Sequence, residues 1–190
     1  RNADAALQNL RSKGLLSLES IAGLEEAELA QIIKVSGFYN QKARRLSLLC
    51  KAIIADFGDF ESFKSGVSRE WLLARKGIGA ESCDAILCYA CERAVMVADS
   101  YSARLLGALG YEFESYDELS AWLCELEFER IYEFVNSANS PCDAATKAGK
   151  LENENGVYAL FHGLIVEFCK AHLKGKIFDE SAKIILNDLR

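Results

Sequence analysis

Residues 71–87 read WLLARKGIGAESCDAIL, and this stretch places a Gly-x-Gly turn between two short helical patterns. The first pattern ends at Arg75 and Lys76, and the second begins directly after Gly79. Two glycines let a backbone approach a ligand closely and adopt φ angles that other residues avoid. The free amides at the start of the second helix would carry the positive end of its dipole. The local pattern favours a backbone phosphate site and a plain helix–helix turn equally.

The turn lacks the third glycine of a dinucleotide-binding fingerprint, and no strand pattern precedes it. A Rossmann-type nucleotide site is therefore excluded. Elsewhere the chain of 190 residues has one Pro, and its apolar residues recur at spacings of three and four. We therefore expect an all-α fold of many short helices. They are expected over residues 2–12, 25–36, 40–56, 59–65, 68–74, 80–93, 100–109, 116–136, 155–172 and 179–189. The polar stretch 136–155 is the expected loop or hinge.

Composition limits the classes of function. The chain is 51% hydrophobic and 26% charged, which suits a globular protein with a core. No apolar run reaches the roughly 18 residues of a membrane span, and no secretory signal is visible, so we expect a cytoplasmic protein that makes no membrane contact. The net charge of −6 alone argues against a nucleic-acid partner, because phosphate binding needs Lys and Arg. The placement of the positive charges therefore matters more than their sum.

The seven cysteines are scattered along apolar helix faces, which indicates reduced, buried thiols in a reducing compartment. Two spacings leave a zinc site open: Cys88-x-x-Cys91 and Cys169-x-x-His172. Both pairs lie inside expected helices without the turn that structural zinc prefers, so the pattern favours core thiols.

A second informative stretch, residues 95–106, reads VMVADSYSARLL. Its hydrophobic run delivers Asp99 to the start of an expected helix. Asp is a favoured N-cap residue, so the local pattern by itself favours a capping role for Asp99.

Together these motifs resemble the endonuclease III-like superfamily of DNA glycosylases, which carries a helix-hairpin-helix and then an Asp that opens a helix. Residues 77–79, GIG, match the hairpin; Asp99 matches the Asp; and Arg104 matches an Arg five residues later. Residues 37–46, GFYNQKARRL, match a segment in which a glycine and an aromatic residue precede Lys-Ala, and residues 161–163, FHG, resemble a late His-Gly. The resemblance covers most of the chain and implies the endonuclease III-like fold with a central hairpin.

At two points this sequence departs from the pattern of the bifunctional members of the superfamily, and these differences indicate a subfamily. Bifunctional members place a Schiff-base Lys two residues after the second hairpin glycine, where this chain has Glu81, and a carboxylate cannot form that base. Those members often hold a [4Fe–4S] cluster through four late cysteines, whereas only Cys169 lies that late here, so we expect no cluster. The chain looks most like the bacterial 3-methyladenine DNA glycosylases of this fold, which lack the cluster.

The resemblance implies a monofunctional glycosylase of base excision repair. Such an enzyme would release alkylated purines of the 3-methyladenine type from double-stranded DNA and leave an abasic site. Asp99 would be its catalytic carboxylate, stabilising an oxocarbenium-like transition state and orienting water. Two alternatives stay open: a non-enzymatic helix-hairpin-helix DNA-binding module with Asp99 as a cap only, or an oxidised-pyrimidine glycosylase/lyase.

The resemblance also implies how DNA would be held. The hairpin amides at Gly77, Gly79 and Glu81 would bind a phosphate. A Na⁺ or K⁺ ion would lie on the backbone carbonyls of Leu73, Arg75 and Ile78. The candidates for a positively charged cluster, each of which is equally well explained as a solvated charge, are Lys42, Arg44, Arg45, Arg75 and Lys76.

Several aromatic side chains invite a base-stacking role, but core packing is the expectation for each: Phe38, Tyr39, Trp71, Tyr101 and Trp122. His162 is expected to be a hydrogen-bonded core residue, although contact with the site is open. His172 is expected to be exposed on a late helix.

The expected domains are a six-helix-type domain over residues 20–135, which holds the hairpin, and a second helical domain over residues 1–19 and 136–190. Because the chain opens on Arg1 in a helical pattern without Met, we expect further sequence upstream, including part of the second domain. We expect a monomer, associated with the bacterial nucleoid.

Overall fold

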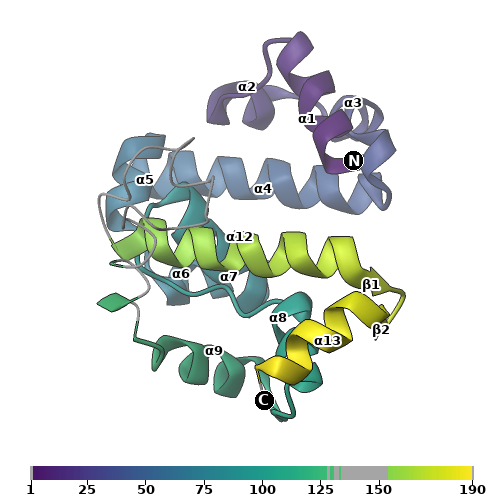
Figure 1. Cartoon of the computed structure of the whole chain (residues 1–190). Coiled ribbons are helices and arrows are strands. Elements are labelled where there is room, and N and C mark those ends of the chain that lie inside the picture. Colours follow the sequence, from purple (N-terminus) through teal and green to yellow (C-terminus); the bar gives the residue numbers. More distant parts are fainter. Residues whose placement is uncertain (1, 128, 131–132, 134–153, 190) are drawn as a thin grey trace. The chain divides into compact units, whose positions relative to one another are not determined.

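The computed structural model describes residues 2–127, 129–130, 133 and 154–189, and these residues are overwhelmingly α-helical (Figure 1). The expected all-α class is therefore confirmed. The chain separates into two compact units, residues 1–78 and residues 79–190, which we describe one at a time. The expected domain boundaries, at residues 20 and 135, stay a prediction.

Unit 1 is built around one long helix. Its elements are α1 (Asn2–Ser12), α2 (Leu18–Gly23), α3 (Glu26–Ile32), the 3₁₀ turn η1 (Lys34–Ser36), α4 (Tyr39–Phe57), α5 (Phe60–Gly66) and α6 (Arg69–Leu73). Helices α2 and α3 both pack on α4. The core between them includes Leu29, Ala30, Ala43 and Cys50, all buried. This packing fixes the face of α4 that remains on the surface.

A cluster of aromatic rings holds α6, the helix that leads into the hairpin. Trp71 lies edge-on to Phe57 at 5.1 Å and to Phe63 at 5.9 Å between ring centroids. Such pairs contribute about 1 kcal/mol each beyond their burial. The indole Nε1 of Trp71 also donates to Asp56 Oδ2 at 2.8 Å. The end of α6 is thus tied to α4 and α5 before the chain turns.

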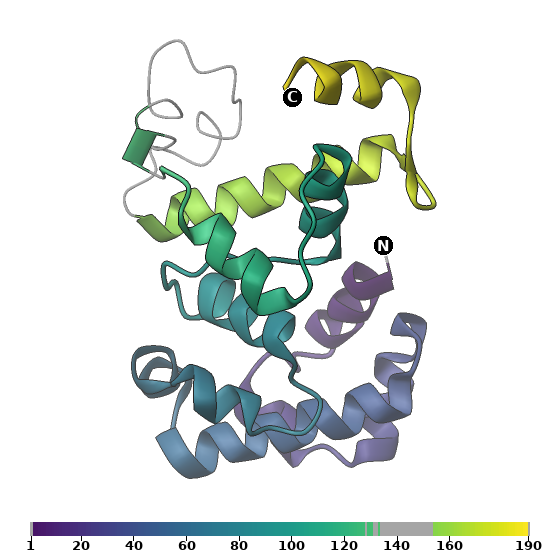
Figure 2. The same cartoon turned by 90° about the horizontal axis from the view of Figure 1, so that it is seen from below.

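Unit 2 is arranged around α12. Its elements are α7 (Ala80–Ala85), the π-helical turn η2 (Ile86–Ala90), α8 (Ser100–Ala108), α9 (Tyr116–Cys124), α12 (Glu154–His172), the strands β1 (Leu173–Lys174) and β2 (Ile177–Phe178), and α13 (Glu180–Asp188). Helix α12 contacts α8 and η2 and passes beside α8 in the second view (Figure 2). The core contains Met96, Val97, Leu106, Val157 and Cys169. The two strands pair antiparallel, Leu173 opposite Phe178.

Three local features differ from the sequence-based expectation. Helix α2 was not predicted; a capping box starts it, because Ser17 and Ser20 each accept the other's backbone N–H. The single helix expected over 116–136 is wrong, since α9 ends at Cys124 and residues 125–127 are not helical. There Leu126 N–H donates to Leu123 O, an i to i−3 bond in place of the helical one. The short β-hairpin was not predicted either.

The predicted state of the cysteines is largely confirmed. Among the described residues the buried cysteines are Cys50, Cys83, Cys88, Cys91 and Cys169, all free of disulfides, and Cys124 is exposed. Burial raises the pKa of the Cys88 thiol to about 11. The predicted loop 136–155 lies outside the described residues up to residue 153, and residues 154–155 belong to α12. In the described part of the chain, the helices are too short or too polar to cross a bilayer.

Candidate active site and phosphate-binding hairpin

The Gly-x-Gly segment forms a surface turn. The backbone N–H of Ile78 donates to Arg75 O at 3.1 Å, which closes a four-residue turn. Gly77, the third residue of that turn, has φ +93°, as in turns that need glycine at this position. Gly79 follows in an extended conformation and is the N-cap of α7, and both glycines are exposed. The turn is therefore open to a ligand rather than enclosed in a core.

The start of α7 differs chemically from most helix starts in the chain. Side chains accept the first amides of six helices: Ser17, Asp59, Ser68, Asp99, Ser115 and Asp179. Gly79 has no side chain and offers no such cap. The first amides of α7 thus keep their capacity to bind an external acceptor, and a phosphate oxygen is the acceptor that suits a helix start.

Positive side chains of unit 1 surround a hollow beside the turn. The hollow measures about 430 Å³ and is lined by Glu26, Asn40, Gln41, Arg44, Arg45, Leu48 and Lys76. The Arg45 side chain lies directly against Gly77, where a Cβ atom would collide with it. Within the described residues, no ion pair neutralises Arg44, Arg45 or Lys76. We call this surface the basic hollow.

The other two candidate cations, Arg75 and Lys42, interact with neighbouring residues of unit 1. The Arg75 guanidinium stacks on the Trp71 ring at 4.5 Å, and its Nε donates to Trp71 O at 3.3 Å. Lys42 Nζ donates to Ser36 O at 2.6 Å, at the end of η1. Glu81 is exposed in the first turn of α7. Of the five candidate cations, Arg44, Arg45 and Lys76 line the basic hollow.

The three carbonyls predicted to hold a monovalent cation come from the same turn. Leu73 ends α6, while Arg75 O already accepts the Ile78 amide. A carbonyl oxygen has two lone pairs, so Arg75 O keeps one for a cation. Oxygen donors suit a hard cation. The residues present therefore fit a Na⁺ or K⁺ ion, and this site stays a prediction.

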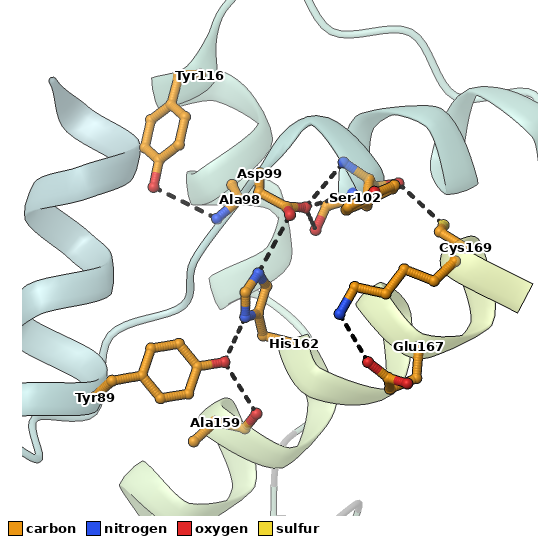
Figure 3. Close-up of polar contacts among 11 residues, drawn as sticks. Tyr89, Ala98, Asp99, Ser102, Tyr116, Ala159, His162, Glu167 and Cys169 are labelled. Carbon is orange, nitrogen blue, oxygen red and sulfur yellow. Dashed lines mark hydrogen bonds and ion pairs between the residues drawn. The ribbon is translucent and has the colours of Figure 1, made fainter. Parts of the chain in front are cut away.

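Asp99 opens α8 and uses its two carboxylate oxygens differently (Figure 3). Oδ1 accepts the backbone N–H groups of Tyr101 and Ser102, both at 2.9 Å, and the Ser102 hydroxyl at 3.1 Å. The predicted N-cap role is thus confirmed, but it occupies only one oxygen. Oδ2 is left for other chemistry, and the side chain retains 13% exposure. A capping role and a catalytic role do not exclude each other here.

His162 of α12 faces the second oxygen of Asp99. Its Nε2 lies 3.5 Å from Asp99 Oδ2, within ion-pair distance but without the geometry of a hydrogen bond in the described chain. Its other ring nitrogen, Nδ1, is 2.5 Å from the Tyr89 hydroxyl. Figure 3 shows the resulting line of contacts from Tyr89 through His162 to Asp99. Tyr89 and His162 are 73 residues apart in sequence, so no local pattern predicts their contact.

Two opposing effects set the pKa of Asp99. Burial raises the pKa, whereas interaction with His162 and hydrogen bonds from Ser102 lower it, and the net pKa lies below the ordinary value. The carboxylate is therefore ionised at neutral pH. Burial, together with the charges of Cys88 and Asp99, raises the pKa of Tyr89 to about 12, so its hydroxyl stays protonated.

Residues around Asp99 fix the backbone that carries it. The Tyr116 hydroxyl lies 3.4 Å from the Ala98 amide and donates to the buried Asp84 at 2.9 Å. Asn155 Nδ2 donates to the carbonyls of Cys88 and Arg93, which tie the start of α12 to η2 and to the segment leading to Asp99. The backbone before Asp99 is thus held by residues that precede it in the chain and by residues that follow it.

Four of the five aromatic side chains expected to pack do so. Tyr39 and Tyr101 pack against cores, Trp71 against Phe57 and Phe63, and Trp122 against Tyr111 and Phe113.

The expectation for Phe38 is wrong. It is 86% exposed, with φ +47°, because it is the N-cap residue of α4 and its left-handed backbone turns the ring away from the core. The expectation for His172 is also wrong, since it is half-buried and its Nδ1 lies 3.2 Å from the Asp179 carboxylate.

The family of this fold follows from the chain's sequence relatives. The sequence pattern of the HhH-GPD superfamily of base excision DNA repair proteins matches residues 1–123. The chain belongs to this superfamily. It is 32% identical to a protein of Methanocaldococcus jannaschii described as a candidate DNA repair glycosylase, over 97% of the chain and 76% of that protein. It is also 27% identical to the thymine/uracil-DNA glycosylase of Methanothermobacter thermautotrophicus, over 55% of the chain and 47% of that protein.

Solved structures agree with this assignment. The 3-methyladenine DNA glycosylase of H. pylori, bound to 1,N6-ethenoadenine, superposes with a TM-score of 0.78 and 42% identity, over 91% of the chain and 79% of that protein. An endonuclease III–DNA complex superposes with a TM-score of 0.67 over 97% of the chain and 72% of that protein, at 18% identity. The expected endonuclease III-like fold is confirmed.

Proposed function

We propose that the chain is a monofunctional DNA glycosylase that hydrolyses the bond between deoxyribose and an alkylated purine of the 3-methyladenine type. The observation that carries this proposal is Asp99, an ionised carboxylate with one oxygen bound in a helix cap and the other left for chemistry. The purine class is supported by the 42% identity to a 3-methyladenine glycosylase.

DNA would be held mainly by unit 1 and the hairpin. The uncapped amides of Gly77, Gly79 and Glu81 would bind one phosphate of the damaged strand, and the basic hollow would bind neighbouring phosphates. A Na⁺ or K⁺ ion on the carbonyls of Leu73, Arg75 and Ile78 would supply positive charge at the same phosphate. Local binding of this kind lets a chain with a net charge of −6 associate with DNA.

The chemistry would take place on a base turned out of the helix. An N3-alkylated adenine carries a positive charge, so the C1′–N bond breaks with its electron pair moving to the base, which leaves neutral. Asp99 Oδ2 stabilises the oxocarbenium-like sugar and accepts a proton from the water that attacks C1′. The products are a free base and an abasic site. No acid is needed to activate the leaving group.

Strand cleavage by a lyase step is not expected of this site. Glu81 occupies the position two residues after Gly79, and a carboxylate forms no Schiff base with the sugar. The prediction that no iron–sulfur cluster is bound agrees with this hydrolytic chemistry, which requires no redox group.

Double-stranded DNA methylated with tritiated dimethyl sulfate provides the test. The protein should release 3-methyladenine and leave abasic sites that break only on later treatment with alkali. Sodium borohydride should trap no covalent protein–DNA adduct. Binding to this DNA without any release of base would favour the non-enzymatic DNA-binding module instead, and an adduct would favour a lyase.

A further inference from the structure

The two oxygens of Asp99 have unequal surroundings, and the difference points to residues outside the sequence motifs. Oδ1 accepts from three donors, on Tyr101 and Ser102. Oδ2 faces only the His162 Nε2 atom among the contacts that the structure describes (Figure 3). A carboxylate fixed through one oxygen can still rotate slightly about its Cβ–Cγ bond. Whatever faces Oδ2 therefore decides where that oxygen points.

The orientation of His162 depends on which ring nitrogen carries the proton. The Tyr89 hydroxyl lies 2.5 Å from Nδ1 and 3.4 Å from the carbonyl of Ala159. Both are hydrogen bonds, but a hydroxyl has a single proton to donate, and we assign it to the shorter contact, with Nδ1 as the acceptor. A neutral imidazole that accepts at Nδ1 carries its proton on Nε2, which faces Asp99. The side chain of His162 is only 12% exposed, so solvent competes little for this proton.

We propose that Tyr89 and His162 are positioning residues for the glycosylase reaction: Tyr89 fixes the Nε2–H tautomer of His162, and that N–H orients Asp99 Oδ2 toward the sugar. The inference rests on the proposed function. A neutral donor is the suitable partner here, because it directs the carboxylate without cancelling the negative charge that stabilises the sugar cation. The 3.5 Å separation leaves Oδ2 able to accept from water as well.

Other titratable groups lie close enough to affect the pair. Cys169 on α12 interacts with both Asp99 and Arg104, a residue of α8. Cys169 Sγ also lies 3.7 Å from the Tyr101 carbonyl, behind the cap. Burial raises the pKa of the Cys169 thiol, so it stays neutral. Asp99 is therefore the group expected to govern the acid limb of the pH response.

The tautomer can be measured without substrate. The chain has two histidines, so ¹⁵N-histidine labelling of the whole protein gives two imidazole spin systems, and His172→Gln assigns them. We expect His162 as the neutral tautomer protonated at Nε2, and a mixture of tautomers in Tyr89→Phe. A His162 protonated at Nδ1, or a tautomer unchanged by Tyr89→Phe, would overturn the proposal.

Activity gives the second readout, as single-turnover release of 3-methyladenine from methylated DNA. His162→Ala should slow release about tenfold, a typical reduction for a residue that orients a functional ligand. His162→Gln should restore most of the rate, because its amide can donate to Oδ2. His172→Gln serves as the matched control and should react like the wild type.

The pH profile separates positioning from general disruption of structure. Interaction with His162 lowers the pKa of Asp99, so His162→Ala should raise it and move the acid limb of the rate profile to higher pH. In an Asp99→Asn background, His162→Ala should reduce the rate by less than about twofold, because the two residues act as one unit. An unmoved acid limb or independent reductions would contradict the proposal. If the wild type releases no base, the proposed function fails, whereas the tautomer result stands by itself.

Discussion

The hairpin region and the Asp99 region differ in how far their charged and polar groups are exposed to solvent and already hydrogen-bonded. In the described part of the chain, the start of α7 exposes backbone amides that no side chain caps, and in unit 1 cations without an ion-pair partner line the basic hollow next to Gly77. Asp99 is largely withdrawn from solvent, and hydrogen bonds occupy one of its oxygens. An open, unsatisfied surface suits an external phosphate. A partly buried, partly satisfied carboxylate suits stabilisation of a charge that forms only in the transition state. We infer that binding belongs to the first region and chemistry to the second.

The largest expected effect comes from removing the charge in the second region alone. Asp99→Asn should lower single-turnover base release by about 10²–10³-fold, the usual cost of removing one electrostatic interaction with a transition state. Asn is also a good N-cap, so folding should be preserved. Thermal unfolding and DNA binding, measured beside base release, provide the controls. Near-normal release would remove Asp99 from the chemistry.

Neutralising the first region should change binding. Replacing Arg44, Arg45 and Lys76 together by Gln should reduce the slope of log affinity against log salt by about 0.9 for each phosphate that the protein no longer neutralises. Lys183→Gln is the matched control, because Lys183 already pairs with Glu180 at 2.6 Å. Titrations of a labelled duplex at several salt concentrations measure the slope. An unchanged slope would mean that the basic hollow does not bind DNA.

The two hairpin glycines should respond unequally. Gly77→Ala places a side chain at φ +93° and displaces Arg45, so it should cost about 1–2 kcal/mol of stability and weaken DNA binding. Gly79→Ala meets nothing within 4 Å and has an ordinary φ, so it should cost less than Gly77→Ala, and only because Ala is a poorer N-cap than Gly. Urea unfolding compares the pair. Equal destabilisation would show that the turn does not depend on the conformation of Gly77.

The smallest expected effect concerns the exposed ring of Phe38. Phe38→Ala should leave the free energy of unfolding unchanged within about 0.5 kcal/mol, because the side chain contributes little to a core. An exposed aromatic ring can stack on a base, and its removal should weaken DNA binding by about 1 kcal/mol. Tyr39→Ala is the contrasting variant, since Tyr39 packs against a core and its truncation should reduce stability. Normal binding by Phe38→Ala would exclude stacking of this ring on DNA.

The same two regions show how much a sequence can predict. The hairpin depends on glycine spacing within a few residues, so the sequence predicted its turn and its position between α6 and α7. Helix periodicity predicted α1, α4, α8, α12 and α13 well, because each buries an apolar stripe. The cap of Asp99 is equally local, and it was predicted.

What sequence reasoning missed depends on contacts between distant segments or on unusual backbone. His162 is hydrogen-bonded and nearly buried, as expected, but its partner Tyr89 lies 73 residues away in sequence and was not predicted. Phe38 was expected to pack because it is apolar, but the left-handed backbone at that residue places its ring in solvent. The break after Cys124 occurs where i to i−3 bonds replace helical ones, which apolar spacing does not reveal.

Base release measured against protein concentration tests the division between binding and chemistry most directly. Single-turnover rates on methylated duplex DNA should be compared for Asp99→Asn and for the triple variant of Arg44, Arg45 and Lys76. The account predicts that Asp99→Asn lowers the plateau rate without moving the half-saturating concentration. The triple variant should move half-saturation and keep the plateau rate. The reverse pattern would contradict the assignment of chemistry to Asp99 and of binding to the basic hollow.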